Sequence, residues 1–472
     1  MSNRFRGKYC FLILLFFAAG WLLCQTSSAS RASPLTQPAS NPSVPFAILQ
    51  APVDAIPPEE SKPLPGPKGI EEIPNELSLA ALVEEVLARN PSLAQMTAAW
   101  EAASARYPQV TSLDDPMFGA VLAPASFGTN TVEPGYRLEV SQKFPFPGKL
   151  RLRGQTALAE ASAAGNDVED MRLQLTEAAK LAFFEYFLVQ RALVVNAEGL
   201  ELLSKYRQNA AVRVKTGLAP GQDILQADVE IGRQRERSIV LERIRKVAAA
   251  RINTLLNLPP DSPLLDPPEQ LRVAPGLPPV ESLRALALAR RPDLKALQDR
   301  LNADQNALAL AYREYCPDVE AMAAYDSIMG NGPSRDLAPQ VGFRINLPVR
   351  LGRRDAAVAE ARAKIAQRQA ELVARTNQVS FQVQEAFEQL KESERVLALY
   401  DKTVLPSARQ NVKAAEAAYG TGKIPFLSLI EAERNVVNLR DRYYEATADY
   451  FRRRANLERI VGAPIASEEE PR

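Results

Sequence analysis

The chain carries a long internal duplication, and this limits its possible folds more than any other feature. The segment KTGLAPGQDILQAD, from Lys215 to Asp228, returns as GTGKIPFLSLIEAE, from Gly420 to Glu433, at an offset of 205 residues. A second matching pair, ARNPSL from Ala88 and ARRPDL from Ala289, extends the repeat toward the N-terminal side of each copy. A repeat of this length predicts two copies of one structural unit.

The N-terminal part is expected to stay outside the repeated unit. Residues 1–29 combine early basic residues with an apolar run from Tyr9 to Leu23, which is typical of a signal peptide. A short membrane anchor is an alternative, although the run is below the roughly 20 residues that span a bilayer. A further alternative is lipid modification of Cys24, although Leu23 is not the small residue that normally precedes such a cysteine. We expect a proline-rich tether over 30–75, a first structural repeat over 76–279 and a second over 280–472.

Composition excludes several classes of function. The net charge is +1 and no long basic run is present, so nucleic acid is not an expected partner. The chain has no histidine, and Cys316 is the one cysteine of the expected mature chain. This argues against a disulfide, a metal site and many enzymes. The FPFPGKL segment lacks the spaced glycine and the Ser or Thr of a phosphate-binding loop. We therefore expect no catalytic residue and no cofactor.

Long helices are predicted in both copies. No proline occurs between Gly148 and Lys215, and this stretch is rich in Ala, Leu, Glu, Gln and Arg, so it predicts a helix of about 100 Å. The corresponding stretch from Pro348 to Tyr419 contains Pro406, where we expect a kink or break. Heptad-like apolar spacing predicts coiled-coil packing, and a coiled-coil scaffold is the plainer interpretation of these helices.

Four short segments alternate with a period of two and are predicted to be strands. They cover about 117–124, 135–145, 317–328 and 338–347. Arg137, Glu139, Arg344 and Asn346 lie on polar faces and alternate with apolar residues. Such strands suit a transmembrane barrel with lipid outside and water within. Because small barrels need about eight strands, several chains would have to contribute, and the pattern leaves their number open. Two soluble surface hairpins are the alternative.

With these features the chain resembles the TolC family of outer-membrane efflux proteins, from Leu77 to Pro464. The resemblance rests on the repeated order of elements, the paired turns TGLAPGQD and TGKIPFLS, the segment LPSARQNVKAAEAAYGTGKI, and FPFPGK after a strand. The last motif is similar to one found in the branch of the family that serves heavy-metal resistance pumps. The fold class implied is mainly α with a small β membrane part, in which duplicated coiled-coil helical hairpins accompany four strands per chain that complete a trimeric barrel of about 12 strands.

The resemblance also implies function, location and partners. A homotrimer would conduct substrate passively through the outer membrane and extend into the periplasm, in contact with membrane lipid. A periplasmic adaptor protein and an inner-membrane efflux transporter would be its partners. The alternative function is the adaptor itself, which should carry a single hairpin between β-rich domains. An exported coiled-coil structural protein is a further alternative, but it would need no amphipathic strands. The sequence does not identify the transported compound, the pump or the gating mechanism.

The resemblance assigns roles to two groups of residues near the hairpin turns. The residues that the resemblance implies would dock the adaptor, at the periplasmic tips, are Thr216, Gly217, Leu218, Gly422 and Lys423. Glycines in such turns are expected at positive φ, which helix-hairpin geometry alone also explains.

The residues expected to constrict the tunnel are Asp223 and Glu431. Under threefold symmetry, the three copies of each residue would form a ring of acids. A second acidic position of the family is Ser428 here, which weakens a cation-binding gate. The alternative for both acids is a favourable interaction with a helix dipole. Arg137, Glu139, Arg344 and Asn346 are expected to line the barrel.

Overall fold

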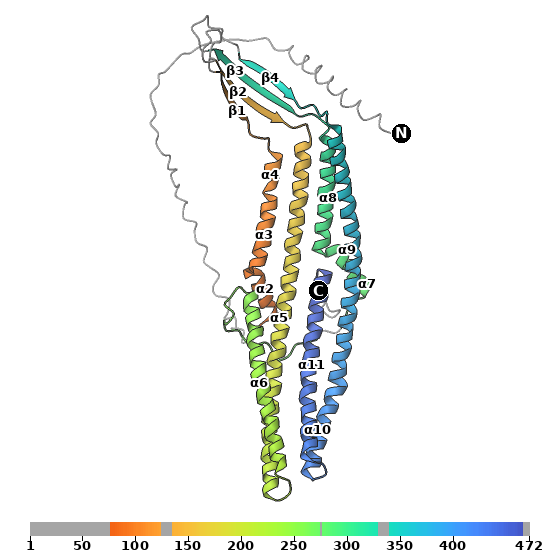
Figure 1. Ribbon diagram of the computed structural model, residues 1–472. Helices are drawn as coiled ribbons and strands as arrows, with labels where there is room; N and C mark the ends of the chain where they lie inside the picture. The colour runs from red at the N-terminus through yellow and green to blue at the C-terminus, as the bar shows by residue number, and fades with distance from the viewer. Residues whose placement is uncertain (1–75, 124–134, 274–275, 329–338, 466–472) are drawn as a thin grey trace, which may run out of the picture. The chain divides into compact units, whose positions relative to one another are not determined.

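The fold is taken from a computed structural model, which describes residues 76–123, 135–273, 276–328 and 339–465 (Figure 1). These residues belong to one compact unit, Pro74–Arg472. The expected signal peptide over 1–29 and tether over 30–75, together with the question of Cys24, lie outside the described residues.

The two halves of the unit follow the same general order, with differences in the number of short helices and in the continuity of the long helix. The first half contains α2 (Leu79–Arg89), α3 (Pro91–Ser104), α4 (Arg106–Thr111), β1 (Met117–Ala123), β2 (Gly135–Phe144), α5 (Lys149–Lys215) and α6 (Gln222–Leu255). The second half contains α7 (Val280–Arg290), α8 (Pro292–Arg313), β3 (Val319–Ile328), β4 (Gln340–Ile345), α9 (Leu351–Leu399), the π-helix η1 (Tyr400–Val404), α10 (Leu405–Gly420) and α11 (Phe426–Val461). Each copy therefore supplies short helices, two strands and a long helical hairpin.

The long helices follow the proline pattern. Helix α5 is continuous over 67 residues and begins directly after Gly148, in agreement with the predicted stretch. In the second copy the helix is interrupted by η1, which ends at Val404, two residues before Pro406. Pro406 cannot donate a backbone hydrogen bond, and its ring crowds the carbonyl one turn earlier, so the wider π turn accommodates it. The predicted break at Pro406 is confirmed.

All four strands form a single antiparallel sheet in the order β1-β2-β3-β4 (Figure 1). Strands β2 and β3 pair over ten residues, from Gly135 opposite Ile328 to Phe144 opposite Val319. The two strand pairs therefore form one sheet and not two separate hairpins. The strands are shorter than predicted: β3 starts after Pro317, which has no N–H to donate, and β4 ends before Asn346.

Apolar clusters hold the helices together, including a small one between α10 and α11 around Val412 and Val436. One joins α2 and α3 to α5, α6 and α11, another joins α7 and α8 to α9 and α11, and a third lies near the hairpin turns. Alanines such as Ala179 and Ala227 are fully buried in them and let the helices approach closely. Within the described ranges, no helix has both the length and the apolar character needed to cross a bilayer.

Candidate docking tips and channel-lining face

The two hairpin turns close with the same backbone motif. At the end of α5, Gly217 has φ +72° and donates to the carbonyl of Val214 at 3.1 Å, while Leu218 donates to Arg213 at 2.8 Å. This pair of bonds is the Schellman ending of a helix, which satisfies carbonyls that the last turn leaves free.

The second copy repeats the motif residue for residue. Gly422 has φ +74° and donates to Tyr419 at 3.0 Å, while Lys423 donates to Ala418 at 2.9 Å. The predicted positive φ is confirmed at both glycines. Pro425 is the N-cap of α11, but Pro220 lies one residue before the N-cap Gly221 of α6, so neither proline opens its helix as the first helical residue.

All of the residues predicted to dock an adaptor lie on these exposed turns. Thr216, Gly217, Gly422 and Lys423 are exposed, and Leu218 is 69% exposed although it is apolar. The turns thus offer a protruding apolar side chain and unhindered backbone, which suit a protein contact.

The two acids predicted to form a constriction differ in their surroundings. Glu431 is exposed and faces a shallow groove between α10 and α11 that Asn411, Ser428 and Asn435 also line. Asp223 is 7% exposed and accepts a hydrogen bond from the Tyr419 hydroxyl at 3.1 Å. Within one chain, Asp223 therefore joins the two hairpins, whereas Glu431 is available to an open space.

Sequence reasoning missed Tyr419 as the partner of Asp223, and it missed Arg213, which packs on Tyr419. Arg213 donates to the Gly420 carbonyl at 2.8 Å and its guanidinium lies 4.7 Å from the centre of the Tyr419 ring. Burial first, and then the bond to Asp223, raise the pKa of the Tyr419 hydroxyl to about 12, so it remains a donor. The available signal was a break in the repeat, because at the 205-residue offset Arg213 and Tyr419 correspond to Ala418 and Val214.

Further polar contacts join the hairpins away from the turns. The Tyr206 hydroxyl on α5 donates to Glu416 on α10 at 2.5 Å. Arg434 on α11 pairs with Glu230 on α6 at 2.7 Å. Arg440 on α11 pairs with Glu198 on α5 at 2.6 Å, and Arg237 pairs with Asp441. The contact between hairpins is thus polar as well as apolar, which is why the heptad pattern alone did not reveal it.

One face of the sheet is apolar and open. Phe118 and Leu122 on β1, Leu138 and Val140 on β2, and Val341 and Phe343 on β4 are exposed and share this face by the strand register. Strand alternation places them on the side opposite the charged residues. A band of exposed apolar side chains on one sheet face is typical of contact with lipid.

The opposite face carries paired charges. The Arg137 guanidinium lies 3.4 Å from Glu139 and 3.8 Å from Asp326, and the Arg344 guanidinium lies 3.1 Å from Glu320 and 3.9 Å from Glu139. The structure thus brings Arg137, Glu139 and Arg344 together. Asn346 lies just beyond β4, where its N–H donates to the Asp318 carbonyl at 3.1 Å. Asp326 and Glu320 were not among the predicted lining residues, because the alternation of their strand is weaker.

The lysine of the FPFPGK motif is buried where the strands meet the helices. Lys149 is 1% exposed, and its ammonium contacts Asp318 at 2.8 Å, Glu314 at 3.3 Å and the Cys316 carbonyl at 3.2 Å. These acceptors compensate the buried charge. The motif thus fixes the junction between the sheet and α5.

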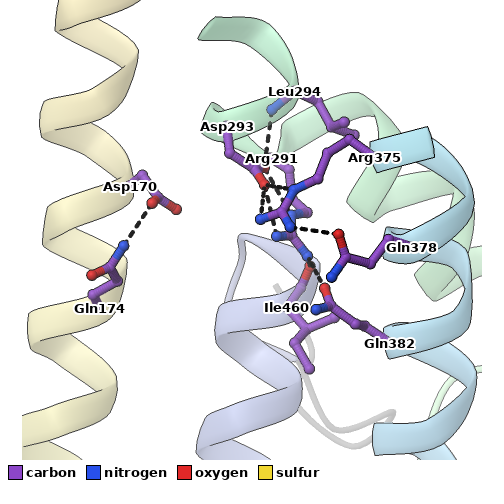
Figure 2. A network of polar contacts seen from close by, with 9 residues as sticks. All are labelled: Asp170, Gln174, Arg291, Asp293, Leu294, Arg375, Gln378, Gln382 and Ile460. Carbon is purple, nitrogen blue, oxygen red and sulfur yellow. Dashed lines mark hydrogen bonds and ion pairs between the residues drawn. The ribbon is translucent and has the colours of Figure 1, made fainter. Parts of the chain in front are cut away.

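A second buried network holds the ARRPDL segment between α7 and α8 (Figure 2). Arg291 binds both carboxylate oxygens of Asp293 at 2.9 and 2.8 Å, and Arg375 from α9 donates to Asp293 at 2.8 Å. Arg291 also donates to Gln382 at 3.0 Å and to the Ile460 carbonyl at 3.4 Å. Burial would raise the pKa of Asp293, but the bonds from Arg291 and Arg375 outweigh it and hold this pKa below its usual range.

Metal ligands are not grouped in the part of the chain that the structure describes. No three His, Cys, Asp or Glu side chains there are arranged so that they could hold an ion.

Several solved structures with this fold are outer-membrane proteins or channels. The outer-membrane channel OprN is 22% identical, with a TM-score of 0.71, and the alignment covers 82% of this chain and 90% of that protein. The outer membrane protein VceC of Vibrio cholerae is 19% identical, with a TM-score of 0.70 and coverage of 82% and 97%. The MtrE outer membrane channel of Neisseria gonorrhoeae is 18% identical, with a TM-score of 0.69 and coverage of 83% and 91%. The predicted fold class is confirmed.

The sequence itself matches a family model. Residues 283–463 match the family described as outer membrane efflux protein. The match lies in the second structural repeat and agrees with the resemblance on which the turn and strand motifs were interpreted. An uncharacterised protein of Haemophilus influenzae is 24% identical over 251 residues, and the chain spans about half the length of this curated relative.

Proposed function

We propose that the chain is one protomer of a homotrimeric outer-membrane channel that extends into the periplasm. It passively conducts substrates that an inner-membrane transporter delivers through a periplasmic adaptor. The observation that carries this proposal is the amphipathic four-stranded sheet, joined at one end to two long helical hairpins. Energy for transport comes from the transporter, so the channel needs no catalytic cycle of its own.

The sheet supports closure with other copies of the chain. Among the described strands, β1 and β4 each have one neighbour, so each leaves one edge of the sheet to be paired. A bilayer tolerates no open edge, because unpaired backbone groups cannot bind water there. Pairing β4 of one protomer with β1 of the next is antiparallel and continues the sheet. Three copies supply about 12 strands, enough for a channel wider than the smallest barrels.

Exposed apolar residues on the helices support the same assembly. Leu225 and Ile239 on α6 are exposed, and so are Val373 and Phe381 on α9. Because α6 packs along α5 whereas α9 packs along α8 and α11, these residues belong to two different faces of the protomer. Contact between two different faces is head-to-tail, and such contacts form a ring when the rotation between neighbouring copies closes.

Within this assembly the polar sheet face lines the barrel, with Arg137, Glu139 and Arg344 in the lumen and Asn346 at its periplasmic edge. The hairpin turns dock the adaptor through the exposed residues named above. Glu431 is the better candidate for a constriction, since it is exposed, whereas Asp223 is bound to Tyr419. Ser428 beside Glu431 leaves one acid per protomer in this groove.

The adaptor alternative is not favoured. An adaptor should carry one hairpin interrupting β-rich domains, but the described chain has two hairpins and one sheet of four strands. The exported coiled-coil scaffold is also not favoured, because such a protein would not need a sheet with one apolar and one charged face.

Membrane fractionation and conductance test the proposal. The full-length protein should sediment with the outer membrane, need detergent for extraction and produce ion currents in a planar bilayer. A photo-reactive residue at Leu218 or Lys423 should crosslink an adaptor in cells, while the same residue at the exposed Glu281, far from the turns in sequence, should not. A protein that is soluble after gentle lysis, or a trimer without conductance, would contradict the channel proposal.

A further inference from the structure

The two edges of the protomer carry opposite charges where the sheet meets the helices. Strands β1 and β4 lie at opposite edges of the sheet (Figure 1). The chain enters β1 from α4 and leaves β4 toward α9, so the segment before β1 and the segment after β4 lie at the same end of the sheet. The first segment carries Asp114 and Asp115, and the second carries Arg350 and Arg353. All four residues are exposed.

The acidic edge is held in place, but its carboxylates are not paired. The Asp114 carbonyl accepts a hydrogen bond from the Gln142 amide at 2.7 Å, which fixes this segment against β2. In the part of the chain that the structure describes, no cation pairs with the Asp114 or Asp115 carboxylate, although Lys143 lies across from them by the β1–β2 register. The adjacent Leu113 is 45% exposed. This edge therefore presents two negative charges beside an apolar side chain.

The basic edge is held by two successive tight turns. Val349 donates to the Leu347 carbonyl at 2.9 Å, and Leu351 donates to the Val349 carbonyl at 3.1 Å. Arg350, the central residue of the second turn, has φ −86° and ψ 75°, which is the conformation of an inverse γ-turn. No acid among the described residues pairs with Arg350 or Arg353, and Val349 is 79% exposed. This edge therefore presents two positive charges beside an apolar side chain.

We infer that Asp114 and Asp115 of one protomer form ion pairs with Arg350 and Arg353 of the next, at the junction between barrel and helices. The inference rests on the proposed function, because it needs β4 of one copy to pair with β1 of the next. That pairing is antiparallel, so it brings the start of β1 beside the end of β4. Complementary charge then helps to select which edges meet. A lipid phosphate could also bind the two arginines, but it would leave the two acids unpaired.

These ion pairs are individually weak, but a ring repeats them. An exposed ion pair changes an equilibrium by at most about fivefold. If each contact between neighbouring copies loses about fivefold, the three contacts of a trimer together lose about a hundredfold. Salt screens exposed charges, so the loss should shrink in about 1 M salt. The size of the effect and its dependence on salt are therefore both measurable on the assembled ring.

Charge reversal and charge exchange test the inference on the purified full-length protein, by mass measurement in detergent at falling concentration. Arg350→Glu/Arg353→Glu should weaken the trimer by at least about a hundredfold, and so should Asp114→Lys/Asp115→Lys. The protein that combines all four substitutions should recover the trimer, because the charges are opposite again. Arg151→Glu is the control, since it reverses an exposed arginine at the start of α5, which follows the inner strand β2, and it should leave the trimer unchanged.

Three results would overturn the inference: a charge reversal at either edge that leaves the trimer intact, a fourfold variant that dissociates as readily as the reversals, or an equal loss in Arg151→Glu. Dissociation of Arg350→Glu/Arg353→Glu beside an intact Asp114→Lys/Asp115→Lys trimer would assign the arginines to lipid phosphate instead. Bilayer conductance separates this inference from the proposed function. A conducting wild type without rescue by charge exchange overturns the inference alone, whereas a wild type that forms no trimer overturns the proposed function as well.

Discussion

Gly148 combines a left-handed backbone with a crowded surrounding. Its φ is +90°, and an added Cβ would lie 2.7 Å from the Arg313 guanidinium, which donates to the Pro147 carbonyl at 2.6 Å. Gly148→Ala should cost the roughly 1–3 kcal/mol of backbone strain, and about 1 kcal/mol more because the displaced Arg313 guanidinium gives up its bond to Pro147. Thermal unfolding of the detergent-solubilised protein checks this as a lowered midpoint.

Two other glycines serve as controls for this prediction. Gly217 has a similar φ of +72° with nothing within 4 Å, so Gly217→Ala should show the strain without the crowding. Gly352 is helical without a positive φ and has open space, so Gly352→Ala should be neutral or stabilise by up to about 1 kcal/mol. An equal effect at Gly148 and Gly217 would refute the role assigned to Arg313.

Asp293 is the residue on which two arginines converge, and its removal should be costly. Asp293→Asn leaves the buried Arg291 guanidinium without its carboxylate, and the loss of one partner of such a pair costs about 3–5 kcal/mol. Because its folded pKa is lowered, its stabilisation is present above the ordinary aspartate pKa and is lost as the pH falls through the folded value.

Unfolding midpoints measured against pH test this. The difference between wild type and Asp293→Asn should be large at neutral pH and should shrink in acid. Glu281→Gln, at an exposed position in the first turn of α7, should show no difference at any pH. A gap that stays constant down to strongly acidic pH would contradict the ion-pair account.

At the scale of elements, η1 distinguishes the second hairpin from the first. Helix α5 is unbroken, whereas η1 interrupts the equivalent helix just before Pro406. Pro406→Ala restores a backbone donor and removes the ring, so it should slow hydrogen exchange over 400–406 and stabilise by up to about 3 kcal/mol. Ser407 is the exposed neighbour of Pro406, and Ser407→Ala should leave hydrogen exchange over 400–406 unchanged. Unaltered exchange in Pro406→Ala would mean that tertiary packing, and not the proline, produces the π turn.

Local patterns predicted the elements well but not how they meet. Proline positions and period-two alternation located α5, the break at Pro406 and all four strands, because these depend on neighbouring residues. Pairing of β2 with β3, and the burial of Asp223 against Tyr419, depend on residues 175 to 196 positions apart in sequence. No local pattern carries that information, so Asp223 looked like a free acid near a helix start. Lys149 shows the same limit, since its motif was visible but its buried acceptors were not.

At the scale of the whole molecule, the proposed trimer depends on apolar faces that a single chain leaves exposed. Phe381 on α9 is 65% exposed, and Leu218 at the first turn is 69% exposed. If α9 packs against α6 of the next protomer, Phe381→Ser removes about 1.5–3 kcal/mol of burial from each of the repeated contacts, whereas Leu218→Ser removes none. Mass measurement in detergent at falling concentration should then show Phe381→Ser dissociating first. Leu218→Ser should stay as stable as the wild type but, with the photo-reactive residue at position 423, should crosslink the proposed adaptor poorly. Equal dissociation of the two variants would mean that the ring is held by strand pairing alone and that the exposed helix faces serve another partner.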